Sequence, residues 1–437
     1  MSMELLNAMN GAACPCGRPH SFHADVVIGK GVIARIPELI RSLGGTKAFV
    51  LADVNTYRAA GERVCNLLQQ AHIPFSTHTF PQEALEPDEK SVGSAVMHYD
   101  ATCDVIVTVG SGVLNDIGKI LSNLTGHPYM IVGTAPSMDG YASASSSMTR
   151  DGLKISLPSR SADVIVGDTD ILCQAPLHMM KAGLGDMLAK YVSICEWRIS
   201  HLITGEYYCE QVAQLIRSAL KRCVDNAKGL LRRDEKAVQA VFEGLVIGGV
   251  AMNYAGLSRP ASGVEHYISH VIDMRAVEFG TPMDLHGIQC AIGTLIAART
   301  YEKLKKIIPD REKALTHATA FDYTAWQQTL REMLGKGAES MIALETREGK
   351  YDVVAHAKRL EVILENWEQI LRIIDEEIPS VLTLTALMDT IKAPKTLQEI
   401  GIDEALLPTI FRATKDIRDK YVLSRLAWDL GIENEII

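Results

Sequence analysis

Three scarcities in the sequence exclude several classes of protein. Its 44 Lys and Arg are outnumbered by 53 Asp and Glu, and the net charge of −9 would repel a phosphate backbone, so nucleic acid is not expected as a partner. No apolar run approaches the roughly 20 residues that a membrane span needs. The nine cysteines, an odd number spread from Cys14 to Cys290, do not form a disulfide framework and fit a reducing compartment. We therefore expect a cytoplasmic protein, and 437 residues predict two domains.

The hydrophobic pattern changes near residue 176. Between residues 25 and 170, β-branched runs alternate with amphipathic segments, which predicts a parallel sheet with helices on both faces. Asp151-Gly152 adds a two-residue hairpin signal. From residue 176 on, apolar residues recur at helical spacing. The predicted fold class is an α/β, Rossmann-like N-terminal domain plus an all-α C-terminal domain. The predicted segments are an N-terminal arm (1–24), the α/β domain (25–175) and the helical domain (176–437).

A glycine-containing turn, Gly110-Ser-Gly-Val-Leu-Asn-Asp116, follows the most apolar expected strand. Glycines there let backbone N–H groups approach a pyrophosphate at a helix N-terminus. The motif is weak by itself, because a plain turn uses the same residues and position 115 is Asn where the dinucleotide fingerprint has Gly. Asp53 ends an earlier strand, where its carboxylate can accept from a ribose hydroxyl, and Asn55 follows. Together they favour a nucleotide site.

A second turn, Gly133-Thr-Ala-Pro-Ser-Met-Asp-Gly140, leaves another expected strand in small and polar residues, and Ser143 follows it. Such residues are suited to lining a ligand. Asp139 before a glycine is a turn former by default. Its carboxylate could also accept hydrogen bonds from substrate hydroxyls.

Acidic and imidazole side chains recur in the helical part at Asp186, His266, His270 and His286. A buried carboxylate and neutral imidazoles are costly in a helical core unless they are paired or bind a metal. His266 and His270 are four residues apart and share one helical face. Each histidine alone is more often a hydrogen-bonded core residue. Jointly, an Asp and two His suit Zn²⁺, Ni²⁺ or Fe²⁺ with one coordination position open.

A weaker metal candidate is Cys14-Pro-Cys16-Gly-Arg-Pro-His20. Its two thiols and imidazole could hold a soft metal if a fourth ligand came from elsewhere. The spacing is not the Cys-x2-Cys of a zinc knuckle, and no second pair follows. The sequence favours a partly exposed N-terminal arm.

The ordered motifs resemble the sn-glycerol-1-phosphate dehydrogenases, and their bacterial branch in particular. That family belongs to the superfamily of iron-type alcohol dehydrogenases, glycerol dehydrogenase and dehydroquinate synthase. The resemblance runs from about Val26 to about Ala298 and rests on Gly110-Ser-Gly-x-x-x-Asp116, Thr134-Ala-Pro-Ser-x-Asp-Gly140, Gly185-Asp186-x-x-x-Lys190, Ser258-Arg-Pro-Ala-Ser-Gly-x-Glu-His266-x-x-Ser-His270 and His286-Gly287.

The resemblance implies a dehydroquinate synthase-like fold, an NAD(P) cofactor bound by the α/β domain, and one divalent metal in the helical domain. The implied metal ligands are Asp186, His266 and His286. The implied catalytic residues are Asp139 and His270, which would contact substrate, with Lys190 a candidate for its phosphate beside Lys154 and Arg259. The implied cofactor-binding residues are Asp53, Asn55, Gly110, Ser111, Gly112, Asn115, Asp116, Thr134, Ser137 and Ser143.

Lys190 is also a departure from the superfamily, because iron-type alcohol dehydrogenases have a fourth ligand His at this position. A protonated Lys cannot bind a metal, so three protein ligands and an open position are expected, which favours zinc or nickel over iron. The stretch from about residue 335 to 396 carries no usable motif. Substrate closure or a partner surface could reside there.

The expected activity is reversible, metal-dependent reduction of dihydroxyacetone phosphate by NAD(P)H to sn-glycerol 1-phosphate, a step of phospholipid biosynthesis. A carboxylate at Asp53 would repel a 2′-phosphate and so leans towards NADH. A homodimer or higher homo-oligomer is expected. Three alternatives remain open: a glycerol or polyol dehydrogenase with no phosphate requirement, a carbon–oxygen lyase of the dehydroquinate synthase kind, and a non-catalytic metal-binding scaffold.

Overall fold

The computed structural model describes residues 2–151 and 153–437, so Gly152 of the expected hairpin turn lies outside the described residues. The chain forms two compact units. The first, here called the sheet unit, comprises Met1–Met187 and Gln214–Leu257. The second, the helical unit, comprises Leu188–Ala213 and Ser258–Ile437.

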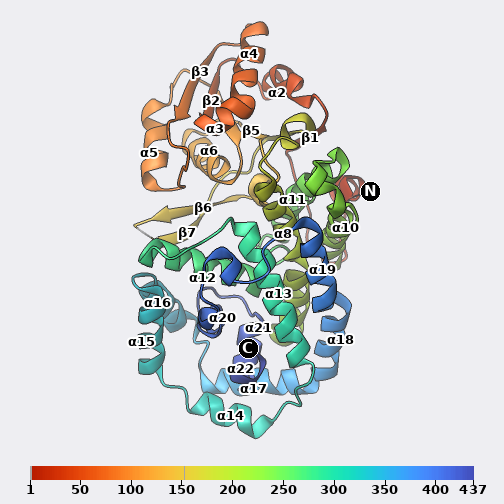
Figure 1. Ribbon diagram of the computed structural model, residues 1–437, viewed down its shortest axis with the longest axis vertical. Helices are drawn as coiled ribbons and strands as arrows, with labels where there is room; N and C mark the ends of the chain where they lie inside the picture. Colours follow the sequence, from red (N-terminus) through yellow and green to blue (C-terminus); the bar gives the residue numbers. More distant parts are fainter. Residues whose placement is uncertain (1, 152) are drawn as a thin grey trace. The chain divides into compact units, whose positions relative to one another are not determined.

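A six-stranded parallel sheet is the centre of the sheet unit (Figure 1), and it confirms the expected α/β fold class. Its strand order is β1-β8-β5-β4-β2-β3. The strands β4, β5 and β8 are buried along their whole length, as expected for a parallel sheet that is covered on both faces. The strands are β1 (Asp25–Gly29), β2 (Ala48–Asp53), β3 (Phe75–Phe80), β4 (Val105–Gly110), β5 (Tyr129–Gly133) and β8 (Val164–Asp168). A separate antiparallel pair consists of β6 (Ser145–Arg150) and β7 (Leu153–Pro158).

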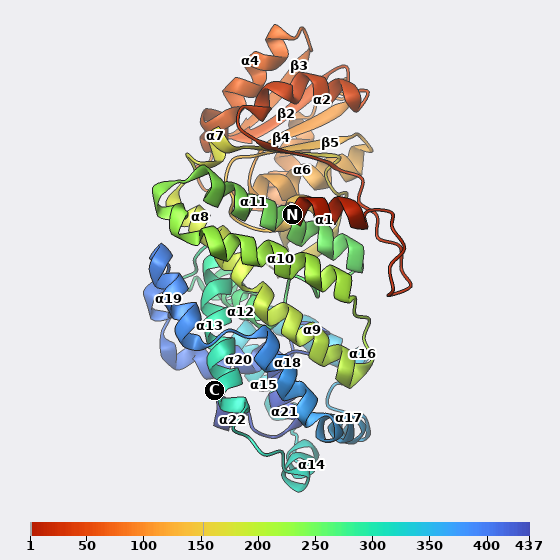
Figure 2. The same cartoon turned by 90° about the vertical axis from the view of Figure 1, so that its right-hand side faces the viewer.

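Helices follow most strands of this unit, and Figure 2 shows α2 and α4 beside the sheet. Ile40, Val64 and Leu68 from these two helices are buried against Val50 and Val107 of the sheet. The helices are α1 (Ser2–Met9), α2 (Ile36–Ser42), α3 (Val54–Thr56), α4 (Glu62–Gln70), α5 (Glu89–His98), α6 (Gly112–Thr125), α7 (Thr169–Leu172), α8 (Leu177–Leu188) and α11 (Glu235–Ala255). The helix α10 (Glu210–Asn226) begins in the other unit.

The long helix α11 packs against the ends of two strands. A Cβ at Gly133 or Gly167, the last or next-to-last residue of β5 and β8, would lie 2.8 Å and 2.3 Å from the ring of Phe242. Glycine at both positions therefore leaves the room that the Phe242 ring occupies. The helix is long and apolar enough to cross a membrane, but 83% of its most apolar window is buried inside the protein. The sequence pattern grouped α8 and α11 with the helical domain, whereas their packing groups them with the sheet.

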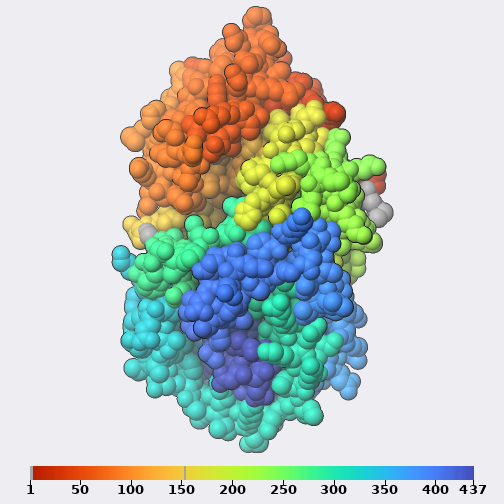
Figure 3. All heavy atoms as spheres, viewed as in Figure 1, coloured from red at the N-terminus to blue at the C-terminus, as the bar shows by residue number. Residues whose placement is uncertain are grey.

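All regular elements described in the helical unit are helical. In Figure 3 blue atoms near residue 400 lie against green-teal atoms near residue 280, and a Cβ at Gly401 would lie 3.3 Å from Pro282. The unit's helices are α9 (Lys190–Thr204), α12 (Val264–Phe279), α13 (His286–Leu304), α14 (Arg311–Thr319), α15 (Tyr323–Leu334), α16 (Gly337–Glu348), α17 (Val353–Glu365), α18 (Trp367–Glu377), α19 (Val381–Ile391), α20 (Leu407–Ala413), α21 (Leu423–Asp429) and α22 (Glu433–Ile436).

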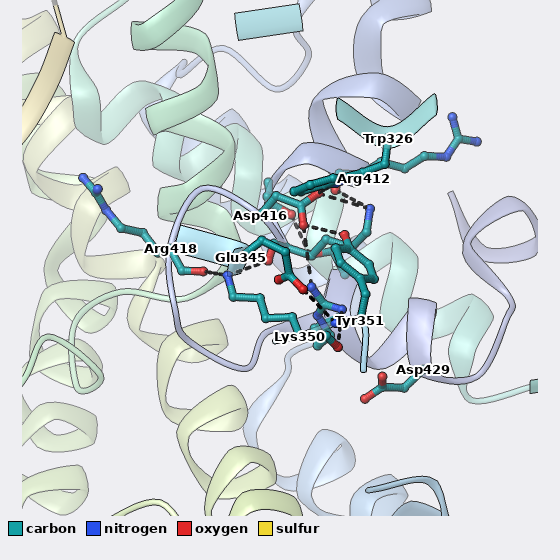
Figure 4. A network of polar contacts seen from close by, with 12 residues as sticks. Trp326, Glu345, Lys350, Tyr351, Arg412, Asp416, Arg418 and Asp429 are labelled. Atoms are coloured by element: carbon teal, nitrogen blue, oxygen red, sulfur yellow. Dashed lines mark hydrogen bonds and ion pairs between the residues drawn. The ribbon is translucent and has the colours of Figure 1, made fainter. Parts of the chain in front are cut away.

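A buried polar network ties part of the motif-free stretch to the C-terminal helices (Figure 4). The Glu345 carboxylate accepts from the backbone N–H of Tyr351 at 3.0 Å. The Tyr351 hydroxyl donates to Asp416, which also accepts from the Trp326 indole N–H at 3.1 Å. The Arg425 guanidinium lies 4.5 Å from the centre of the Tyr351 ring. Residues 345–351 thus contribute to the core of the helical unit.

Candidate active site

The sheet has a topological switch point between β2 and β4. These strands are neighbours, but β2 leads to β3 on one side and β4 leads to β5 on the other. Open parallel sheets bind ligands beyond the carboxyl ends of their strands at such a point. Asp53 ends β2 and Gly110 ends β4, so both predicted nucleotide-binding residues flank it.

The turn after β4 requires glycine because the chain packs tightly there. A Cβ at Gly110 would lie 2.7 Å from Cβ of Leu114. A Cβ at Gly112 would lie 3.4 Å from Cγ of Met138, so this position has more room. The turn also opens α6 (Gly112–Thr125), a 14-residue helix whose first N–H groups suit an anion.

The two predicted turns lie side by side. Thr134 donates its backbone N–H to the carbonyl of Gly110 at 3.0 Å. The hydroxyls of Ser111 and Ser137 are hydrogen-bonded to each other, and the Tyr141 hydroxyl lies 3.2 Å from Ser111 Oγ. The structure therefore brings Gly110, Ser111, Thr134 and Ser137 together at the start of α6.

Three other predicted cofactor residues already have partners within the protein. Asn115 is fully buried and donates to the carbonyl of Gly140 at 2.9 Å. Asp116 forms a 2.8 Å ion pair with the buried Lys119, whose ammonium also donates to Ser143 Oγ at 3.2 Å. These residues shape the turn from the inside. Their contact with a cofactor remains a prediction.

Asp53 caps the short helix that follows β2. Its Oδ1 accepts from the backbone N–H groups of Asn55 at 2.9 Å and Thr56 at 2.7 Å. The Asn55 side chain is exposed and donates to the carbonyl of Glu83 at 3.0 Å. Helix capping is by itself a sufficient reason for a carboxylate at this strand end. Contact between Asp53 and the ribose of the cofactor therefore also remains a prediction.

Asp139 and Asp186 meet within the sheet unit. The backbone N–H of Asp139 donates to Asp186 Oδ2 at 2.9 Å, and the Asp186 side chain is fully buried. Two glycines permit this approach. A Cβ at Gly183 of α8 would lie 1.9 Å from the carbonyl oxygen of Pro136, and one at Gly248 of α11 would lie 3.1 Å from Cβ of Asp139.

Three imidazoles cluster in the helical unit, where α12 and α13 pack together (Figure 1). The ring centres of His266 and His286 are 4.9 Å apart, and those of His270 and His286 are 5.8 Å apart. Single ligand atoms of His266, His286 and Cys290 lie within 4.8 Å of one another. Burial raises the pKa of the Cys290 thiol, but the neighbouring His266 and His286 outweigh this and leave the pKa below its ordinary value.

The buried Glu265 carboxylate orients His266, and the Glu196 carboxylate lies close to it. Its Nδ1 lies 2.8 Å from Glu265 Oε1, which also accepts from the backbone N–H of Gly263 at 2.7 Å. Glu196 accepts from the N–H groups of Val264 at 2.9 Å and Leu423 at 2.8 Å. Burial raises the pKa of Glu196 to about 8, and the neighbouring Glu265 charge is the second cause of this rise. The Glu196 carboxyl is therefore largely protonated near neutral pH.

The hydrogen bonds of the histidine cluster fit a metal ion. His266 Nδ1 contacts Glu265, and His286 Nδ1 contacts Ser269 Oγ at 2.9 Å. Histidines that bind metal through one ring nitrogen almost always donate the other N–H to a protein group. With both Nδ1 atoms engaged in this way, the two Nε2 atoms are suited to hold a divalent cation.

The basic candidates for the substrate phosphate differ in their surroundings. Lys190 is fully buried, and its ammonium donates to the carbonyl of Ala261 at 3.0 Å. Arg259 is also buried, and it binds Glu206 through Nε at 2.9 Å and the carbonyl of Tyr421 at 2.7 Å. Arg259 therefore has a structural role in holding the segment around Tyr421.

Solved structures define the class of fold. The glycerol dehydrogenase of Schizosaccharomyces pombe aligns with a TM-score of 0.61 over 95% of this chain and 90% of that chain, at 17% identity. A 1,3-propanediol oxidoreductase aligns with a TM-score of 0.60 over 96% of this chain and 100% of that chain, at 15% identity. The family model of iron-containing alcohol dehydrogenase matches residues 27–176. The fold is that of the iron-type alcohol dehydrogenases.

Curated relatives narrow the class to a family. The glycerol-1-phosphate dehydrogenase (NAD(P)+) of Halalkalibacterium halodurans is 33% identical over 301 residues, 67% of this chain and 75% of that protein. The corresponding protein of Geobacillus thermodenitrificans is 26% identical over 421 residues, 95% of both. The chain belongs to the glycerol-1-phosphate dehydrogenase family, which confirms the resemblance seen in the sequence.

Sequence reasoning missed three groups beside the predicted residues: Glu265, Cys290 and Lys119. Glu265 and Cys290 carried a usable signal, because one precedes His266 and the other follows His286 by four residues on the same helical face. Lys119 carried none. Its contacts with Asp116 and Ser143 depend on how α6 packs against the chain around residue 145.

Proposed function

We propose that this chain catalyses the reversible, metal-dependent reduction of dihydroxyacetone phosphate to sn-glycerol 1-phosphate with NADH or NADPH. The proposal is carried by membership of the glycerol-1-phosphate dehydrogenase family, whose relatives bear that activity in their names. A bound divalent metal polarises a ketone oxygen, and a reduced nicotinamide supplies the hydride.

Asp186, His266 and His286 are the proposed metal ligands. The support lies in the chemistry of each group: a buried carboxylate, and two imidazoles whose Nδ1 atoms are engaged by Glu265 and Ser269. Neutral imidazoles and a carboxylate suit Zn²⁺ or Ni²⁺, with Fe²⁺ as the third choice. The nearby Cys290 thiol, with its lowered pKa, favours the softer ions.

The proposed cofactor site lies at the carboxyl edge of the sheet. Gly110, Ser111 and Gly112 would offer backbone N–H groups to the pyrophosphate at the start of α6, with Thr134 and Ser137 beside them. Asp53 has its Oδ1 engaged as a helix cap, so its Oδ2 would accept from the adenine ribose. A 2′-phosphate there would meet a carboxylate, which supports a preference for NADH.

The remaining proposed roles concern the substrate. Asp139 would accept from a substrate hydroxyl, and its carboxylate lies near that of Asp186. His270 would hold the substrate and pass a proton to or from its oxygen. Lys190 would meet the phosphate, because a buried ammonium is a strong partner for an oxyanion.

The test is the protein stripped of metal, reloaded with one metal at a time, and given dihydroxyacetone phosphate with each nicotinamide. We expect NADH consumption only with metal, and loss of both bound metal and turnover in H266A and H286A. H98A, a change at an exposed residue of α5, serves as the control. Turnover of glycerol equal to that of glycerol 1-phosphate would favour a polyol dehydrogenase. Conversion of substrate without net NADH change would favour a lyase.

Three further parts of the proposal concern the location of the protein, its pathway and its oligomeric state. A cytoplasmic location is supported by nine free cysteines among the described residues, which fit a reducing compartment. A role in phospholipid biosynthesis would follow from the product, a glycerol phosphate that can carry acyl or alkyl chains. A homodimer is expected, and sedimentation analysis of the purified protein tests it.

A further inference from the structure

The N-terminal arm folds back on itself and brings thiols and an imidazole together. Cys14 to Gly17 form a tight turn, in which the Gly17 N–H donates to the carbonyl of Cys14 at 3.0 Å and Gly17 has φ +78°. One ligand atom each of Cys14, Cys16 and His20 lies within 4.8 Å of the other two. None of the proposed catalytic roles uses this cluster.

The His20 ring is held in the orientation of a metal ligand. Its Nδ1 lies 3.1 Å from the carbonyl oxygen of Tyr254, and only 1% of the residue is exposed. Because a carbonyl oxygen can only accept, Nδ1 carries the proton. The other ring nitrogen, Nε2, is therefore the unprotonated one, the form in which an imidazole binds a metal, and it faces Cys16 Sγ. An N–H donated to a backbone carbonyl is the usual support of a metal-binding histidine.

The distance between these two atoms matches a shared zinc ion. Zinc binds a thiolate at about 2.3 Å and an imidazole at about 2.0–2.1 Å, so a tetrahedral arrangement holds the two ligand atoms about 3.6 Å apart. Cys16 Sγ and His20 Nε2 are 3.5 Å apart. A weak S–H···N hydrogen bond would occupy the same distance, but it would give no reason for a second thiol, that of Cys14, at the same point.

Other hydrogen bonds close the loop of the arm, and one of them joins the arm to α11. Asn10 and Phe22 exchange two hydrogen bonds of 2.8 and 2.9 Å, which close the loop between them. Gly11 donates to the carbonyl of His20 at 2.7 Å. The Tyr254 hydroxyl donates to the carbonyl of Leu6 at 3.3 Å. Figure 2 shows α1 beside α11 and the extended loop that follows it.

We propose that Cys14, Cys16 and His20 bind a structural zinc ion that fastens the N-terminal arm to α11. This ion is additional to the metal of the proposed dehydrogenase centre and shares no ligand with it. Two thiolates and an imidazole are soft ligands that select zinc over magnesium or calcium. The fourth coordination position is left for a water molecule or another side chain.

The first test counts zinc in the full-length protein after loading under reducing conditions and desalting. We expect about two zinc ions per chain in the wild type, about one in C14S/C16S, and about one in H266A/H286A. C173S, a cysteine change outside both clusters, should keep the wild-type content. The proposal is overturned if C14S/C16S binds as much zinc as the wild type. It is also overturned if the wild-type protein contains a Cys14–Cys16 disulfide after purification under reducing conditions.

The second test distinguishes this site from the dehydrogenase centre by spectroscopy. Cobalt bound to thiolates absorbs in the near ultraviolet, and this band should appear in the wild type, in H266A/H286A and in C290S. The band should disappear in the double variant H20Q/C16S. This variant replaces C14S/C16S in the test if C14S/C16S does not fold. A chelator should also speed proteolysis between residues 10 and 24 in the wild type. An unchanged cleavage rate, or a band that depends on Cys290 alone, would contradict an arm-bound ion.

Discussion

The contact between Gly183 and Pro136 offers the sharpest test of how the proposed site is assembled. A Cβ at position 183 would lie 1.9 Å from the Pro136 carbonyl oxygen, whereas real Cβ contacts stay above 3.0 Å. In G183A, α8 and the loop must therefore separate by about 1 Å. Both sides are backbone, so no side chain can rotate away. Overpacking of this kind costs about 1–3 kcal/mol, occasionally more.

The same displacement should lower activity beyond its effect on stability. It moves Asp186 away from the Asp139 N–H, now 2.9 Å distant, and misplacing catalytic groups by about 1 Å can cost about 100-fold in rate. We expect G183A to lose most turnover at a temperature where it remains folded. G93A is the matched control, because a Cβ on Gly93 of α5 meets nothing within 4 Å. Calorimetry and steady-state kinetics that find G183A indistinguishable from G93A would refute the reasoning.

Three further changes have expected outcomes. E265Q should weaken metal binding about 10- to 100-fold in a chelator competition, because it weakens the hold on His266 Nδ1, whereas E345Q should leave metal affinity unchanged. F242A should lower the unfolding free energy by about 3–5 kcal/mol in urea titration, because the ring is fully buried, while F279A, at a 46% exposed site, should cost far less. Burial lowers the pKa of Lys420 to about 7, so the folded state binds fewer protons than the unfolded state from about pH 7 to 10.5. Wild-type stability should therefore rise relative to K420M by about 2 kcal/mol between pH 7 and 9, and a flat or falling difference would contradict the assigned shift.

The fold class was predictable because the sheet strands are short, apolar and bounded by turns. The helical spacing of apolar residues predicts a helix, but it does not show in which of the two units the helix packs. The sequence of α11 is typical of a buried helix, but its place on the sheet depends on Phe242 filling the space that Gly133 and Gly167 leave open. Those contacts join residues about 75 to 110 positions apart, and nothing in a local window reports them.

The candidate site was predictable where residues that can bind a metal recur at a spacing that places them on one helical face. His266 and His270 share a helix face, and His286 joined them on residue type, because imidazoles in a helical core are costly unless they are paired or bind a metal. The missed groups act through other residues, as Glu265 does through His266. Asn115 and Asp116 stand in the predicted cofactor turn, yet their partners are Gly140 and Lys119. A motif identifies the residues of a turn, but it does not say which of them point inwards.

The most direct test of the central claim measures NADH oxidation with dihydroxyacetone phosphate by wild type and by H266A/H286A, each stripped and reloaded with zinc or nickel. We predict metal-dependent formation of sn-glycerol 1-phosphate by the wild type alone, with H98A matching it. Equal turnover by the metal-free wild type, or by the double histidine variant, would contradict the account.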